Sequence, residues 1–152
     1  MSDTSKCPHW VLPYIGIPYD EGGRHKDVGL DCWGLLRTVY WEQYKVDLPE
    51  FKGFKWNVND TRTQLSALEA FIVQERNELI ERGTFHEVPA ECAQEGDAIV
   101  VRTLGWPLHI GIYLYKGYML TSREGCNACI ESYLHPAIAP RVDGFYRHES
   151  LI

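Results

Sequence analysis

The order of helical and strand patterns along the chain predicts an α+β fold. Two helical patterns come first, over about residues 32–44 and 61–82, and five short strand patterns follow from residue 98 onward. Closely spaced turn residues between the strands favour antiparallel hairpins. Helices followed by a run of strands are typical of a layout in which the helices pack on a meandering sheet.

Length and composition fit a single domain. A chain of 152 residues is long enough to bury a core of its own. Its net charge of −6 argues against a nucleic-acid partner, because such proteins carry a basic surface. No segment approaches the roughly 20 apolar residues of a membrane span. Residues 1–10 lack the apolar core of a signal peptide. We expect these residues to form a flexible arm and residues 11–152 to form one domain.

The first helical pattern begins at a cysteine that follows a glycine-rich loop. Asp31 is a good helix N-cap, which places Cys32 in the first turn of the helix. The backbone N–H groups and the helix dipole favour negative charge there, so we expect a lowered pKa and a reactive thiolate at Cys32. The alternative is that Cys32 is a small buried apolar residue, the commoner role of a lone cysteine. The apolar positions that predict the helix are Leu35, Leu36, Val39, Tyr40 and Tyr44, and the loop glycines are Gly22, Gly23 and Gly29.

The other segments before the strands have weaker signals. We interpret residues 10–17 as a short helix or an extended entry to the fold, and residues 24–27 as a solvated charged tip. Residues 50–60 form an aromatic-rich loop. Residues 61–82 form a scaffold helix that starts with a capping-box pattern, and residues 85–88 form a short strand.

A histidine at the start of a strand is the second candidate for chemistry. His109 opens the pattern His-Ile-Gly-Ile-Tyr-Leu, in which Gly111 leaves space beside the imidazole. An imidazole beside Cys32 is able to take the thiol proton and later protonate a leaving amine. The alternative is a histidine hydrogen-bonded at a strand edge, and spacing alone does not bring the two residues together. The predicted strands cover residues 98–103, 109–115, 118–122, 130–133 and 142–147.

The cysteine count predicts no metal site. Five cysteines cannot all pair within one chain, which indicates a reducing compartment or at least one free thiol. Cys126 and Cys129 form a lone CxxC, and a zinc site needs two further ligands at recognisable spacing. We therefore interpret this pair as thiols in a hairpin loop, and we expect no metal and no cofactor.

Several weak motifs occur in an order that is known from one family. From about Trp10 to Arg147, the chain resembles the NlpC family of papain-like cysteine peptidases. More narrowly, it is similar to the branch found in the tails of phages and phage-like particles, through the tryptophan after the cysteine and the closing Gly-Phe-Tyr-Arg. The motifs are Pro18-Tyr19-x-x-Gly22-Gly23, Gly29-Leu30-Asp31-Cys32-Trp33-Gly34-Leu35, Gly96-Asp97, His109-Ile110-Gly111-Ile112-Tyr113-Leu114 and Gly144-Phe145-Tyr146-Arg147.

The resemblance implies a papain-like α+β fold with the nucleophile at a helix N-terminus, packed on a central antiparallel sheet. It also implies cleavage of peptidoglycan stem peptides, typically between D-glutamate and the diamino acid. Carried over by position, Cys32 is the nucleophile and His109 the general base. Tyr19 places its hydroxyl near the oxyanion, and Asp31 caps the helix and helps to hold the amino end of the substrate.

One position departs from the family pattern. The family usually has a third polar residue, often histidine, about a dozen residues after the base, where it fixes the imidazole tautomer. Here that position is Thr121, which can accept a hydrogen bond but carries no charge. Ser122 takes this place if the hairpin register differs by one residue, and His135 is a more distant candidate.

Two functional interpretations follow. The first is a thiol endopeptidase of a phage-type tail tip, made in the host cytoplasm without a signal peptide and located in the tail of a virion or virus-like particle. Its partners are the stem peptide and tail-hub or tail-tip proteins, with no nucleic acid. The second is a structural tail module of weak or no activity, motivated by the neutral Thr121. Acyl transfer by the same Cys–His pair is a third possibility.

Overall fold

The computed structural model describes residues 7–48, 84–103, 106–123 and 125–152. The predicted helix over 61–82 and the whole aromatic loop over 50–60 therefore lie outside the described residues. The same is true of residues 1–6 of the expected N-terminal arm.

The predicted first helix is present. Helix α1 (Cys32–Val39) continues into a π-helical turn, η3 (Tyr40–Tyr44). Lys45 ends it in the left-handed conformation, with φ of 57°. The shorter 3-10 helices are η2 (His9–Tyr14), η4 (Ala90–Cys92), η5 (Ala139–Arg141) and η6 (Glu149–Leu151).

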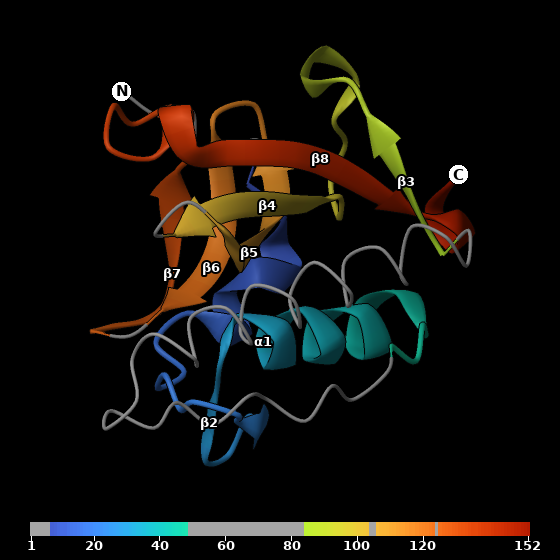
Figure 1. Ribbon diagram of the computed structural model, residues 1–152. Coiled ribbons are helices and arrows are strands. Elements are labelled where there is room, and N and C mark those ends of the chain that lie inside the picture. The colour runs from blue at the N-terminus through green and yellow to red at the C-terminus, as the bar shows by residue number, and fades with distance from the viewer. Residues whose placement is uncertain (1–6, 49–83, 104–105, 124) are drawn as a thin grey trace, which may run out of the picture.

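An antiparallel sheet covers one side of α1 (Figure 1). Its six strands lie in the order β3-β8-β4-β5-β6-β7, so that the meander from β4 to β7 is extended by β8 and β3. A separate hairpin, β1 (Arg24–His25) with β2 (Gly29–Leu30), leads into α1. The bounds of the sheet strands are β3 Phe85–Val88, β4 Ala98–Thr103, β5 Trp106–Tyr115, β6 Tyr118–Arg123, β7 Cys126–Ser132 and β8 Val142–His148.

Two strands start earlier than the sequence predicts. Strand β5 begins at Trp106, so His109 is its fourth residue and does not open it. Strand β7 begins at Cys126, so Cys126 and Cys129 lie in a strand and not in a hairpin loop. Pairing with β4 and β6 extends both strands. The alternation of apolar and polar residues did not predict these extensions. They depend on cross-strand hydrogen bonds, which a sequence pattern does not show.

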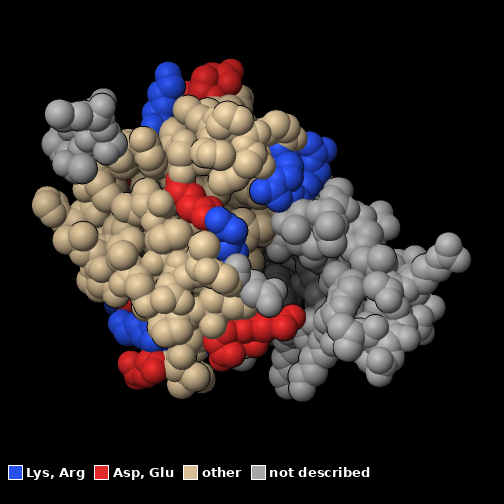
Figure 2. All heavy atoms as spheres, turned by 90° about the vertical axis from the view of Figure 1, so that its left-hand side faces the viewer, with Lys and Arg blue, Asp and Glu red and all other residues tan. Residues whose placement is uncertain are grey.

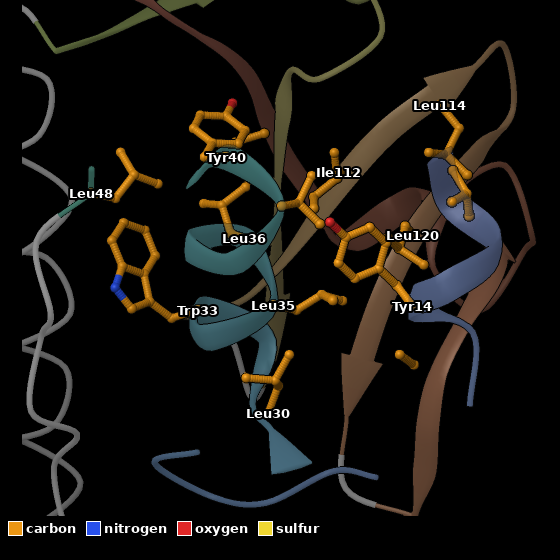
Figure 3. Packing of buried hydrophobic residues seen from close by; sticks show 14 of the residues in the cluster. Tyr14, Leu30, Trp33, Leu35, Leu36, Tyr40, Leu48, Ile112, Leu114 and Leu120 are labelled. Atoms are coloured by element: carbon orange, nitrogen blue, oxygen red, sulfur yellow. The ribbon is translucent and has the colours of Figure 1, made fainter. Parts of the chain in front are cut away.

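The main hydrophobic core lies between α1 and the sheet. Leu35 of the helix faces Ile112 of β5 and Leu120 of β6, and these three side chains are almost fully buried (Figure 3). Trp33 lies on another side of the helix, near Leu48. Side chains on more than one side of α1 are therefore buried, which explains why most residues of this helix are apolar.

A second core lies elsewhere on the sheet. Tyr113, Tyr133 and Phe145 make aromatic contacts with one another, with ring centroids 5.5–6.4 Å apart. Nearby, Arg147 contacts the buried Asp97 through two hydrogen bonds of 2.9 Å. Asp97 and Arg147, one residue from each motif, therefore support the fold by joining β8 to the turn before β4.

Charged side chains on the face shown in Figure 2 occur in small groups of both signs. None of the helices in the described ranges is long and apolar enough to span a membrane.

Candidate active site

The loop before α1 is held tightly on the N-terminus of the helix. Oδ1 of Asp31 accepts a hydrogen bond from the Gly34 N–H at 2.7 Å, which confirms the predicted N-cap. Oδ2 accepts from the Gly22 N–H at 3.0 Å. A Cβ on Gly34 would lie 2.1 Å from the carbonyl oxygen of Gly23, so only glycine allows the loop to pass this close.

Cys32 is the first residue of α1, and its sulfur lies against the sheet. Backbone N–H groups of Trp33 and of Ile110 on β5 donate toward it. Because Ile110 directly follows His109, the N-terminus of α1 lies against the strand that carries the imidazole. The structure therefore places Cys32 beside the segment of β5 that holds His109, a proximity that sequence spacing alone did not give.

The side chain of His109 is oriented by the neighbouring strand. Its Nε2 is hydrogen-bonded to Oγ1 of Thr121 on β6, which makes Thr121 and not Ser122 the contact of the imidazole. Ser122 instead donates to the carbonyl of Leu30 at 3.1 Å. His135 is exposed and accepts a hydrogen bond from a backbone N–H two residues on. When Nε2 carries the proton and donates to Thr121, Nδ1 is the basic nitrogen of the ring.

The expected lowering of the thiol pKa is wrong. Desolvation, followed by the charge of Asp31, raises the pKa of Cys32 to about 11, although two backbone N–H groups and Arg24 act in the opposite direction. Burial lowers the pKa of His109 to about 4. Desolvation disfavours the charged form of each group, so the resting pair at neutral pH is a thiol and a neutral imidazole.

The space beside the imidazole is not open as the sequence suggests. A Cβ on Gly111 would lie 2.5 Å from the sulfur of Met119, so the Met119 side chain fills the room that the glycine leaves. Gly111 is therefore required for packing between β5 and β6.

Tyr19 lies in the loop that runs alongside β2. The Leu30 N–H donates to the carbonyl of Pro18 at 2.9 Å, and the Asp20 N–H donates to the carbonyl of Leu30 at 3.4 Å. These bonds hold the partly buried Tyr19 beside the residue two positions before Cys32. Its role at an oxyanion stays a prediction.

No metal site is found among the residues that the structure describes, where no three His, Cys, Asp or Glu side chains form a suitable group. All five cysteines are free thiols.

Comparison with known proteins identifies the family. The sequence profile of the NlpC/P60 family matches residues 16–147, a range that includes Cys32, His109 and Thr121. The chain belongs to the NlpC/P60 family. This membership confirms the predicted papain-like α+β fold and assigns the chain to a family of cysteine peptidases. No curated protein sequence matches the chain significantly.

Solved NlpC/P60 structures share the fold. The NlpC/P60 domain of the peptidoglycan hydrolase SagA has 25% identity and a TM-score of 0.55, with 90% of each chain covered. The P60 domain of an antigen from Mycobacterium avium subspecies paratuberculosis has 19% identity and a TM-score of 0.55, with 91% of this chain and 88% of that chain covered.

A larger NlpC/P60 protein, from Staphylococcus aureus, is similar to a lipoprotein. It has 21% identity and a TM-score of 0.62 over 91% of this chain. The present chain spans 38% of the length of that protein.

Arg24 is the residue of this NlpC/P60 site that sequence reasoning missed. Its Nη1 lies 2.7 Å from Oδ1 of Asp31, and the two side chains are only 9% and 16% exposed. The prediction of a solvated tip over residues 24–27 is therefore wrong for Arg24. The signal in the sequence was its place directly after Gly22-Gly23, where the tight loop turns the side chain inward.

Replacing Thr121 by valine tests how the imidazole is held. Valine keeps the shape of threonine but removes the acceptor, so the orientation and tautomer of His109 are no longer fixed. We expect kcat to fall roughly 10- to 100-fold, the cost of a small misplacement of a reacting group. Thr121→Ser is the matched control and should stay near the wild-type rate. An unchanged kcat in Thr121→Val would exclude the orienting role.

The pH dependence of alkylation tests the neutral resting pair. Because the pKa of Cys32 is raised to about 11, its thiolate fraction at pH 7 is about 300-fold below that of an ordinary thiol of pKa about 8.5. The rate with iodoacetamide should rise about tenfold per pH unit up to pH 10. Peptide mass spectrometry separates Cys32 from the exposed Cys92 in one sample. A plateau that extends below pH 7 would instead indicate a thiolate–imidazolium pair.

Proposed function

We propose that the chain is a thiol endopeptidase that cleaves peptidoglycan stem peptides. The observation that carries the proposal is the placement of Cys32, at the N-terminus of α1, against the strand that holds His109, within an NlpC/P60 domain. The name of one related structure, a peptidoglycan hydrolase, supports the substrate class.

The geometry supports a two-step reaction. Nδ1 of His109 takes the proton of the Cys32 thiol as the sulfur attacks the carbonyl carbon, and the carbonyl oxygen becomes an oxyanion near the N-terminus of α1. The imidazolium then protonates the leaving amine, which leaves a thioester on Cys32. Water attacks the thioester and gives its proton to His109. The acid product departs, and the sulfur regains the proton.

The neutral resting pair fits this sequence. Proton transfer and sulfur attack occur together, so no isolated thiolate has to form in a desolvated site. Arg24 and the backbone N–H of Ile110 oppose the burial of negative charge at the sulfur. These groups therefore stabilise the negative charge that develops on the sulfur while the imidazole receives the proton.

We further propose that the cleaved bond joins D-glutamate to the diamino acid, and that the enzyme acts in the tip of a phage-type tail during penetration of the cell wall. Trp33 and the closing Gly144–Arg147 motif, which resemble the tail branch of the family, support this setting. The expected partners are tail-hub or tail-tip proteins, and the expected location is the tail of a virion or virus-like particle.

Digestion of purified peptidoglycan tests the chemistry. Wild-type protein is incubated with isolated sacculi and with a defined stem peptide, and the products are identified by mass spectrometry. We expect a new free amino group on the diamino acid. Protein alkylated with iodoacetamide at pH 10 is the control. Absence of any product with both substrates would contradict the proposal, and products joined to an added amine would indicate acyl transfer.

The alternative is a structural tail module with little activity, which the raised thiol pKa and the neutral Thr121 favour. It predicts stoichiometric assembly with tail proteins that does not depend on Cys32. Co-purification of tail proteins with wild-type protein that has no hydrolytic activity would support this alternative over the peptidase.

A further inference from the structure

An ion pair crosses the two strands beside the His109–Thr121 hydrogen bond. Thr121 of β6 lies opposite Cys129 of β7. Arg123 follows Thr121 by two residues, and Glu131 follows Cys129 by two residues on the antiparallel strand. The two side chains therefore start on opposite sides of the Thr121–Cys129 pair. Their charged ends meet, with Nε and Nη2 of Arg123 at 2.9 and 2.8 Å from Oε1 of Glu131.

The strand register places the ion pair across the residue pair that includes Thr121, the partner of the imidazole. The Cα partner of Glu131 is Met119, two residues before Thr121, so the carboxylate must reach along the strands to meet the guanidinium. The side chain of Glu131 is 14% exposed, whereas that of Arg123 is 51% exposed. The negative end is thus the less solvated of the two, and its field is less screened by water.

The charges near His109 act in two directions. Glu131 favours the protonated imidazole, and Arg123 and Arg141 disfavour it. Thr121 carries no charge, and the β4 residue opposite His109 is the apolar Val101.

We infer that Glu131 is a positioning residue that stabilises the imidazolium of His109 across Thr121. This inference rests on the proposed peptidase chemistry, since the imidazolium forms when His109 takes the thiol proton. Glu131 supplies the negative charge that the neutral third residue, Thr121, lacks. Neither the CxxC pattern nor the strand pattern in the sequence indicated this role of Glu131.

Three substitutions separate this role from simple support of the sheet. Glu131→Gln removes the negative charge, so the pKa of His109 falls. Arg123→Gln removes the opposing positive charge, so the pKa of His109 rises. A purely structural ion pair would be broken equally by both variants, and would then shift the pKa in the same direction or not at all. Glu131→Asp keeps the charge and should restore a value near the wild type.

The primary measurement does not need a substrate. The imidazole signal of His109 is followed by NMR against pH in each variant and is assigned by its loss in His109→Gln. Glu87→Gln is the matched control, because Glu87 is exposed on β3 at the far edge of the sheet. Opposite pKa shifts for Glu131→Gln and Arg123→Gln would support the inference. Shifts of the same sign, or none, would overturn it.

Hydrolysis then shows whether the charge matters for the reaction. We expect kcat/KM of Glu131→Gln to fall roughly tenfold, the equivalent of one pKa unit, with Glu131→Asp within about threefold of wild type. If Glu131→Gln does not fold, the pKa rise in Arg123→Gln still decides the question. If the wild type cleaves no stem peptide, the proposed function fails, while the NMR shifts still test the electrostatic role.

Discussion

Cys32→Ala protein is expected to cleave stem peptides at least about 10⁴-fold more slowly than the wild type, because no covalent intermediate forms without the sulfur. The fold should persist. Alanine is a good helix residue, and the N-cap bonds of Asp31 to Gly34 and Gly22 do not involve the Cys32 side chain. Loss of activity without loss of structure is what distinguishes a nucleophile from a buried packing residue.

The measurement is the rate of release of the diamino acid fragment, together with the thermal unfolding curve of each protein. Cys92→Ala is the matched control, because Cys92 is an exposed free thiol in η4 and its removal should leave the rate unchanged. Hydrolysis by pure Cys32→Ala at a rate within tenfold of wild type would show that the reaction does not pass through this sulfur. The structural module would then be the better interpretation.

Local chemistry was readable from the sequence where neighbouring residues determine it. Asp31 caps α1 because its carboxylate reaches the N–H three residues on, a relation within one turn. The strands from β4 to β8 followed from alternation and turn residues, with errors at the starts of β5 and β7. Thr121 was predicted from the family pattern, which has a third polar residue about a dozen residues after the base, and Ser122 stayed open because the hairpin register was not known from the sequence.

The electrostatic state of the site was not readable in this way. A helix N-terminus lowers a thiol pKa in water, but here desolvation is the larger cause, and desolvation depends on how the sheet packs on α1. Arg24 looked solvated because its neighbours 25–27 are charged, whereas the Gly22-Gly23 turn directs it to Asp31. The ion pair of Glu131 with Arg123 depends on the register of β6 and β7 across a bulge, which composition does not reveal.

Asp31→Ala is expected to lower the free energy of unfolding by about 3–5 kcal/mol, the range for removing one partner of a buried ion pair. The carboxylate joins the Gly22 and Gly34 N–H groups to the guanidinium of Arg24, and both charged side chains are largely buried. For a domain of this size the melting temperature should fall by roughly 6–20 °C. Asp31→Asn keeps an acceptor for the helix N-terminus and should lose less.

Removing the charge of Asp31, as in Asp31→Asn, should lower the stability of the fold but increase the reactivity of Cys32. The charge of Asp31 is the second cause of the raised thiol pKa, so its removal lowers that pKa and increases the thiolate fraction at neutral pH. Asp31→Asn should therefore be less stable than the wild type, yet alkylate faster at Cys32 between pH 7 and 8. Arg24→Met with Asp31→Asn is the control, because it removes both charges and should return the alkylation rate toward the wild-type value. Slower alkylation of Asp31→Asn would mean that the carboxylate governs the thiol through the loop structure and not through its charge.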